Sequence, residues 1–220
     1  MPFTLYAHPL ASYCHKVLIA LYENDIAFEP RLIDLGSAQD RATLSALWPL
    51  CKFPVLHDPA RQRSVAESSI IIEYLDQAAT VRHPMVPRDA DAALQVRLWD
   101  RIFDNHVQGP MQEIVLDRIQ GGQGDMGRAR STLQTAYGMI DKQLASSPWA
   151  AGQDFSMADC AAAPALFYAC TLEPFPVQAT HLRAYFDRLM DRPSVRRVLE
   201  EAKPFFHFYP FHSAIDPRFL

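Results

Sequence analysis

The pattern of apolar positions divides the chain into a first part that mixes strands and helices and a longer second part that is helical throughout. Short runs rich in β-branched and aromatic residues indicate strands, and apolar residues spaced three and four apart indicate helices. In the first part we expect strands at residues 3–6, 27–34, 53–57 and 64–65 and helices from residue 11 or 12 to 23 and at 68–75. The opening strand–helix–strand order implies a parallel strand pair with a right-handed crossover.

The first helix has a clear pattern, and the segment after the second strand does not. On the helix, Val17 and Leu21 belong to an apolar face, which leaves Lys16 and Glu23 on the solvent side. Residues 36–49 show so little periodicity that we expect them to be irregular or weakly helical.

The second part shows long helical patterns separated by turn residues. One pattern covers residues 91–119, where Gly109-Pro110 must bend or break the helix, and another covers 128–146. Ser156 and Asp159 match a capping box, which marks the start of a central helix whose small side chains suit packing on all sides. These patterns predict an α/β domain over residues 1–77, a linker over 78–88 and an all-α helical domain over 89–220.

Composition and charge exclude several functional classes. The 220 residues carry a formal net charge of −4 without a dense cluster of Lys and Arg, which argues against nucleic acid or an anionic membrane as the main partner. No apolar run resembles a signal peptide or reaches membrane-spanning length, so we expect a cytoplasmic protein. The histidines lack ligand spacing, so no metal is predicted. The cysteines are expected to be free thiols in a reducing cytosol: Cys14, Cys51, Cys160 and Cys170.

The strongest candidate for chemistry is the stretch from the third strand to the following helix. Because Pro54 cannot donate to a sheet ladder, Phe53-Pro54 belongs at the start or edge of a strand. Glu67 and Ser68 then lie at a helix N-terminus, where free backbone N–H groups bind anions. On this stretch alone, an ordinary strand–turn–helix with a capping serine is an equally good interpretation.

This stretch resembles the glutathione-binding half-site of the cytosolic glutathione transferases. In that family a cis X-Pro bond precedes the third strand, and the backbone of X pairs with the cysteinyl part of glutathione as an added β-strand would. The resemblance implies that Phe53 is X and that the Phe53–Pro54 bond is cis. It also implies that Glu67 holds the ammonium of the γ-glutamyl group and that Ser68 holds its carboxylate.

Phrases similar to the family's also lie at 149–159 and 182–195, so the resemblance covers nearly the whole chain. It implies a thioredoxin-like α/β N-terminal domain and an all-α C-terminal domain, in a cytoplasmic homodimer. The implied activity is that of a glutathione S-transferase in detoxification, which adds its co-substrate glutathione, as a thiolate, to a hydrophobic electrophile. Two alternatives stay open: a non-catalytic glutathione-binding or regulatory protein of the same fold, and a glutathione-dependent isomerase.

Side chains near the start of the first helix are the candidates for holding the thiolate. Ser12 is the predicted donor, although the family's serine would align with Ala11, and a plain N-cap serine is as good an interpretation. The phenol of tyrosine-type classes would align one residue after Tyr6, which is therefore expected in the core. Cys14 is expected to face the core or the helix side. A glutathione-dependent reductase would need a cysteine at position 11 or 12, and the Ala-Ser-Tyr phrase here also differs from the Ser-Ser-Cys phrase of the maleylacetoacetate isomerases.

The resemblance gives roles to further residues. Lys52 would reach the glycine carboxylate of glutathione, and a solvated lysine is the alternative. Asp104 would reach the γ-glutamyl ammonium across a two-fold dimer, and a solvated helix acid is the alternative. The electrophile pocket is predicted to be apolar and aromatic, with members that serve equally well as core: His8, Leu10, Phe103, His106 and Met111.

Overall fold

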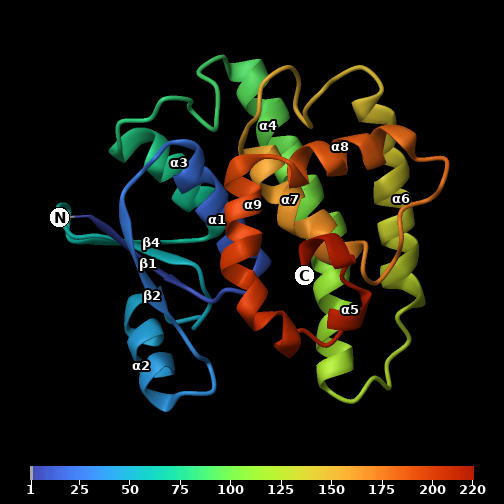
Figure 1. Cartoon of the computed structure of the whole chain (residues 1–220). Coiled ribbons are helices and arrows are strands. Elements are labelled where there is room, and N and C mark those ends of the chain that lie inside the picture. The colour runs from blue at the N-terminus through green and yellow to red at the C-terminus, as the bar shows by residue number, and fades with distance from the viewer. Residues whose placement is uncertain (1) are drawn as a thin grey trace. The chain divides into compact units, whose positions relative to one another are not determined.

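The computed structural model describes residues 2–220 and divides into two compact units, the first ending at Met85 and the second beginning at Val86 (Figure 1). The first unit combines a sheet with helices, and the second is helical. Within the described residues, every helix is too short or too polar to cross a membrane.

The first unit is built on a four-stranded sheet with the order β2-β1-β3-β4. β1 and β2 run parallel, as the strand–helix–strand pattern predicts, whereas β3 pairs antiparallel with both β1 and β4. The strands are β1 Phe3–Ala7, β2 Phe28–Leu32, β3 Val55–Asp58 and β4 Arg63–Ala66. The helices are α1 Ser12–Glu23, α2 Ala38–Leu47 and α3 Ser68–Ala78.

α2 is a regular helix where the sequence pattern indicates weak or irregular structure. Ser37 caps it, because its hydroxyl accepts a hydrogen bond from the Asp40 N–H at 3.3 Å. Leu44 is the one buried residue of this helix. A helix that buries a single side chain has little amphipathic pattern to read, which explains the weak periodicity.

The core of the first unit includes the fully buried Ile33, Leu44 and Val55. Tyr6 and Phe53 are partly buried and pack against these residues. Tyr6, which the sequence assigns to the core, is therefore a partly buried residue that packs against the core.

The second unit is a succession of helices with a π-helical segment, Phe103–Gln108, between the first two. The N–H of Gly109 bonds to the carbonyl of Asp104, a π-type spacing that carries the chain through Pro110 without a break. The bend or break expected at Gly109-Pro110 thus takes the form of a change of helix type. The α-helices are α4 Ala90–Ile102, α5 Gly109–Ile119, α6 Gly127–Leu144, α7 Met157–Ala169, α8 Thr180–Met190 and α9 Pro193–Ala202.

α7 is the central helix of the second unit, and all of its residues are buried, as predicted. The predicted capping box is present: the Ser156 N–H donates to Asp159 Oδ2 at 2.9 Å, and the Ser156 side chain accepts from the Asp159 N–H. Asp159 Oδ1 also accepts the Ala150 N–H at 2.9 Å and the Tyr185 hydroxyl at 2.6 Å. Burial raises the pKa of Asp159, and these hydrogen bonds oppose the rise.

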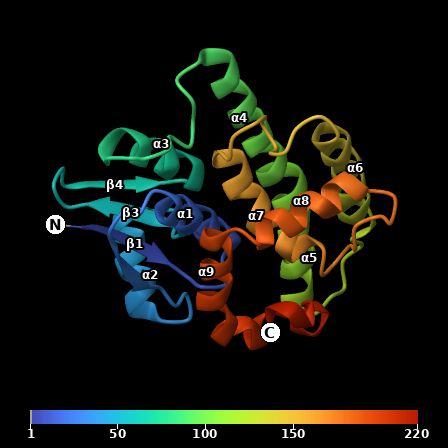
Figure 2. The same cartoon turned by 45° about the horizontal axis from the view of Figure 1, so that its top comes forward.

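The aromatic tail after α9 forms short 3-10 turns, η2 Lys203–Phe208, η3 His212–Ala214 and η4 Pro217–Phe219, that pack within the second unit (Figure 2). The rings of Phe206 and Phe219 lie 5.7 and 5.3 Å from the ring of Phe167 on α7. Tyr209 and Thr171 share a hydrogen bond of 2.8 Å between their hydroxyls. The tail therefore completes the aromatic core around α7.

Candidate functional site

Three parts of the first unit meet at one end of its sheet. The register pairs Tyr6 with Val55 and Val55 with Ala66, so the end of β1, the start of β3 and the end of β4 are neighbours. α1 follows β1 and α3 follows β4, and these two helices lie side by side (Figures 1 and 2). The N-termini of α1 and α3 and the backbone that leads into β3 therefore lie at the same end of the sheet.

The peptide bond between Phe53 and Pro54, just before β3, is cis, as predicted. The Phe53 ring stacks on His8, with ring centroids 5.9 Å apart and an angle of 18° between the planes. The Leu10 N–H donates to His8 Nδ1 at 3.2 Å, which requires an unprotonated Nδ1. Burial lowers the pKa of His8, while the charge of Asp34 acts in the opposite direction, so a neutral ring fits this contact.

At the start of α3, Glu67 is the N-cap residue and Ser68 is the first helical residue. Glu67 has φ 67° and ψ 118°, and its exposed side chain makes no capping hydrogen bond. A non-glycine residue in such a conformation costs about 1–3 kcal/mol and is found mainly at functional sites. Ser68 is buried, and the N–H groups of this first turn have no partner within the helix.

α1 begins at Ser12, one of the two starting residues that the sequence predicts. Ala11 is the N-cap, so the interpretation of Ser12 as a plain N-cap serine is wrong. Ser12 is instead the first residue inside the helix and is 7% exposed. Cys14 is fully buried, and burial raises the pKa of its thiol to about 12, which makes it unreactive.

Lys16 corrects the prediction that it faces solvent. It is 1% exposed, and its Nζ donates to Ser69 Oγ on α3 at 2.9 Å. Its neighbour His15 is also buried, with Nε2 at 2.5 Å from the Pro9 carbonyl. Sequence reasoning missed both contacts, because their partners are not marked by any periodic pattern.

The remaining predicted site residues are distributed over both units. Lys52 is exposed beside Phe53, so both interpretations of it stay open. Asp104 is 7% exposed and accepts from Arg101 Nη2 at 3.0 Å, so its interpretation as a solvated acid is wrong. Of the predicted pocket residues, His8 and Leu10 in the first unit are half-buried, and in the second unit Phe103 and Met111 are buried while His106 is exposed.

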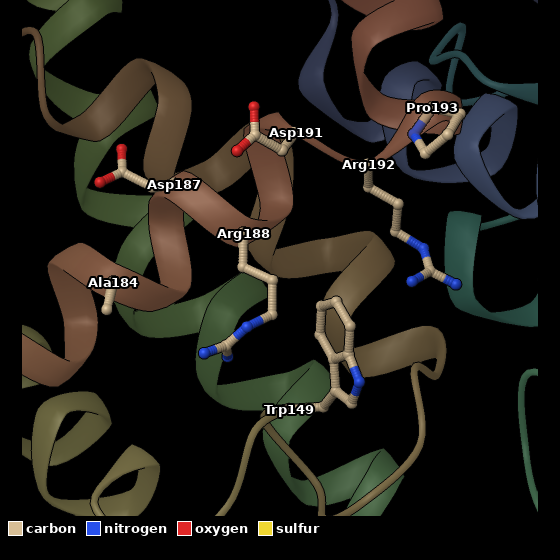
Figure 3. Close-up of a pocket in the computed structure, with 7 residues that line it drawn as sticks. All are labelled: Trp149, Ala184, Asp187, Arg188, Asp191, Arg192 and Pro193. Carbon is tan, nitrogen blue, oxygen red and sulfur yellow. The ribbon is translucent and has the colours of Figure 1, made fainter.

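The second unit has a separate hollow of about 610 Å³ on its α8 face (Figure 3). The guanidinium carbons of Arg188 and Arg192 lie 5.7 and 5.0 Å from the Trp149 ring centroid, and that of Arg192 lies 3.9 Å from the Phe155 centroid. Figure 3 shows both arginines beside the indole of Trp149. These cation–π contacts stabilise the segment that precedes α7. The hollow is lined by Trp149, Ala184, Asp187, Arg188, Asp191, Arg192 and Pro193.

The described part of the chain contains no candidate metal centre. Residues 2–220 contain no cluster of three or more His, Cys, Asp or Glu side chains that could hold an ion. The four cysteines are free, and each is buried or half-buried, as the sequence predicts.

Two families of known domains match this chain. The glutathione S-transferase N-terminal domain matches residues 5–83, and the glutathione S-transferase C-terminal domain matches residues 104–193. Among curated relatives, FtsZ-localized protein A of Caulobacter vibrioides is 27% identical over 215 residues, which cover 91% of this chain and 92% of that protein. A stringent starvation protein A homolog of Haemophilus influenzae is 27% identical over 210 residues, with coverage of 91% and 92%.

Solved structures of glutathione transferases share the fold. A delta-class glutathione transferase of Nilaparvata lugens has a TM-score of 0.84 at 20% identity, covering 98% of this chain and 100% of its own. A glutathione S-transferase of Methylobacillus flagellatus, solved with glutathione bound, has a TM-score of 0.79 at 23% identity, with coverage of 89% and 98%. The two domain matches lie in the order that the family has, one in each half of the chain. The chain therefore belongs to the cytosolic glutathione S-transferase superfamily.

Proposed function

We propose that the first unit binds glutathione and presents its sulfur as a thiolate to a hydrophobic electrophile. The observation that carries the proposal is the juxtaposition of the backbone at Phe53-Pro54, which leads into β3, with the N-terminus of α3 at Glu67-Ser68. An extended tripeptide beside the leading backbone of β3 would direct its γ-glutamyl end toward the N-terminus of α3. Superfamily membership supports glutathione as the co-substrate.

The proposed contacts divide glutathione into three parts. The backbone of Phe53 pairs with the cysteinyl residue, as in strand addition. Ser68 and the N–H groups at the start of α3 bind the γ-glutamyl carboxylate, because a helix N-terminus favours an anion. Glu67, and Asp104 of a second copy in a homodimer, bind the γ-glutamyl ammonium, and Lys52 binds the glycine carboxylate.

The thiolate is proposed to be stabilised at the start of α1. Lowering a thiol pKa of about 8.5 by about two units needs roughly 2.7 kcal/mol of preference for the anion. A hydroxyl hydrogen bond from Ser12 together with the positive end of α1 supplies energies of that order. We further propose the domain division 1–77, 78–88 and 89–220, a cytoplasmic location and a role in detoxification.

A second candidate is a glutathione-binding or regulatory protein that does not conjugate. Ala11 at the N-cap of α1 favours this second candidate, because alanine has no hydroxyl that could bind the sulfur of glutathione. The next residue, Ser12, has a hydroxyl but is buried. The two curated relatives support it as well, since one is named for its localisation with FtsZ and the other for stringent starvation, and neither name states a transfer reaction.

Binding and catalysis are tested in that order. Titration calorimetry with glutathione measures binding, and a panel of electrophiles that includes chlorodinitrobenzene then measures conjugation. Binding with turnover supports the transferase, and binding without turnover on any electrophile supports the second candidate. If glutathione does not bind, both proposals are wrong.

A further inference from the structure

The hollow on the α8 face of the second unit brings two arginines and a tryptophan together (Figure 3). The guanidinium carbon of Arg188 lies 5.7 Å from the centroid of the Trp149 ring, and that of Arg192 lies 5.0 Å from it. Trp149 is half-buried, and Arg188 is exposed. The volume of about 610 Å³ falls within the range of ligand-binding clefts.

The two acids in the lining of this hollow form ion pairs with arginines that do not line it. Asp187 Oδ1 lies 2.9 Å from Nη2 of Arg218, and Asp191 Oδ1 lies 3.5 Å from Nη2 of Arg196. Figure 3 shows both carboxylates turned away from the indole. The charges of the two acids are therefore compensated outside the hollow, and they leave the positive charge of Arg188 in place.

Arg188 is held in position and keeps donors for a ligand. Its Nη1 donates to the Pro148 carbonyl, and within residues 2–220 it forms no ion pair with a carboxylate. A guanidinium carries five N–H donors in a planar fork that matches the two oxygens of a carboxylate. Because the Pro148 carbonyl and the Trp149 ring already restrict this side chain, little conformational entropy is lost when an anion binds.

The sequence around the hollow has an excess of positive charge. Residues 183–197 contain five arginines and two aspartates, although the chain as a whole has a formal net charge of −4. Four of these arginines are exposed, namely Arg183, Arg188, Arg196 and Arg197. An acidic partner is therefore attracted to this part of the surface in spite of the overall negative charge.

We propose that this hollow binds an acidic segment of a partner protein in which a carboxylate lies beside an apolar side chain. The guanidinium of Arg188 receives the carboxylate, and the apolar side chain packs against Trp149 and Pro193. Trp and Arg are enriched at the energetic centres of protein interfaces. Nucleic acid fits this hollow less well, because Asp187 and Asp191 in its lining disfavour a continuous phosphate backbone.

This inference goes beyond the proposed function and does not depend on it, since none of the residues that line the hollow is assigned to glutathione. The test uses the full chain and a short fluorescein-labelled peptide of Asp, Glu and Leu, whose affinity is measured by fluorescence anisotropy. A peptide with Asn and Gln in place of the acids should bind on the order of tenfold more weakly. A peptide with Ser in place of Leu should also lose affinity. Added salt should weaken the binding of the acidic peptide, because the attracting charges are exposed.

Arg188→Gln should weaken the binding of the acidic peptide on the order of tenfold, the loss expected for a charge-assisted hydrogen bond. Arg183→Gln is the matched control, because Arg183 is an exposed arginine of the same helix that does not line the hollow. This variant removes the same charge and should lose much less affinity. Both variants should bind glutathione as the wild type does, which tests the proposed function separately.

Trp149 provides a second measurement that locates the peptide. Binding should change the tryptophan emission of the wild type, which has three tryptophans. The change should disappear in Trp149→Phe, which keeps an aromatic ring for the neighbouring arginines. If Arg188→Gln does not fold, Arg188→Lys, which keeps the charge without the planar fork, should bind the peptide several-fold more weakly than the wild type.

Several results would overturn the inference. They are equal losses of affinity in Arg188→Gln and Arg183→Gln, equal binding of the acidic and the amide peptides, or an emission change that persists in Trp149→Phe. A lower melting temperature of Arg188→Gln with unchanged peptide affinity would make Arg188 a purely structural residue. If a DNA oligonucleotide binds more tightly than the peptide and displaces it, the surface is a general site for polyanions and the inference is wrong.

Discussion

The N-termini of α3 and α7 differ in whether a side chain caps them. At α7, Ser156 and Asp159 satisfy each other, and Asp159 additionally binds the Ala150 N–H and the Tyr185 hydroxyl. At α3, Glu67 occupies the N-cap with φ 67° and makes no side-chain capping bond.

Under the proposed function, the difference separates a helix start that the chain itself satisfies from one that binds a ligand. At α7 the chain provides its own anion, a buried carboxylate, so the donors of the first turn are satisfied from within. At α3 the acid is exposed and the backbone is held in an unfavourable conformation, and the proposed function assigns the N–H groups of the first turn to an external anion. The following predictions test this contrast, from the largest expected effect to the smallest.

Asp159→Ala should produce the largest loss of stability. The substitution leaves the Ala150 N–H, the Ser156 N–H and the Tyr185 hydroxyl without their buried acceptor. We expect the free energy of unfolding to fall by about 3–5 kcal/mol, measured by urea denaturation. Asp159→Asn keeps the shape and should lose less. A loss below about 1 kcal/mol for the alanine variant would contradict the folding role of this helix start.

Glu67→Gly should change stability and binding in opposite directions. Glycine adopts φ 67° without strain, so the free energy of unfolding should rise by about 1 kcal/mol after the entropy cost of glycine is included. The Michaelis constant for glutathione should rise several-fold with little change in kcat, because a remote charged end is bound alike in the ground and transition states.

Glu67→Ala is the companion variant, since it removes the carboxylate and keeps the strain. It should weaken glutathione binding to a similar degree without the gain in stability. Unchanged glutathione affinity in both variants would show that the γ-glutamyl assignment is wrong.

Ser12→Ala tests the third helix start, that of α1. If Ser12 stabilises the thiolate, the pKa of bound glutathione should rise by about one unit, or roughly 1.4 kcal/mol, while glutathione affinity stays nearly constant. The measurement is the thiolate absorbance of the complex as a function of pH, for wild type and variant. Superimposable curves would assign the role to the backbone N–H groups of Ser12 and Tyr13. If neither protein shows a lowered pKa, the non-conjugating candidate gains support.

Local signals in the sequence predicted the order of elements and the two contrasting helix starts. Each of these signals is contained within a few positions of the chain. They are a proline before a strand, a Ser and an Asp at capping distance, and apolar residues that repeat every two positions in strands or every three and four positions in helices. These signals explain why the capping box at Ser156 and the parallel pairing of the first two strands agree with the structure, whereas the cis bond before Pro54 was implied by the family resemblance.

The features that were not predicted depend on distant partners or on single positions. The burial of Lys16 requires Ser69 on another helix, and the burial of Asp104 is accompanied by an ion pair with Arg101. Neither is visible in the apolar pattern, in which a charged residue indicates solvent. Ala11 instead of Ser12 at the N-cap is a shift of one residue, within the usual uncertainty of helix ends.

The smallest expected effect is a pH dependence of stability that arises from Asp159 at the start of α7. Burial raises the pKa of Asp159 above its usual value of 3.8, so the folded state binds this proton more tightly than the unfolded state does. The contribution is fully present below the unfolded pKa and is lost as the pH rises through the folded pKa. Relative to Asp159→Asn, the wild type should therefore lose stability as the pH is raised from 3.8 upward, as urea denaturation across that range would measure. A parallel pH dependence of wild type and Asp159→Asn would mean that the hydrogen bonds from Tyr185, Ala150 and Ser156 fully compensate the burial of the charge.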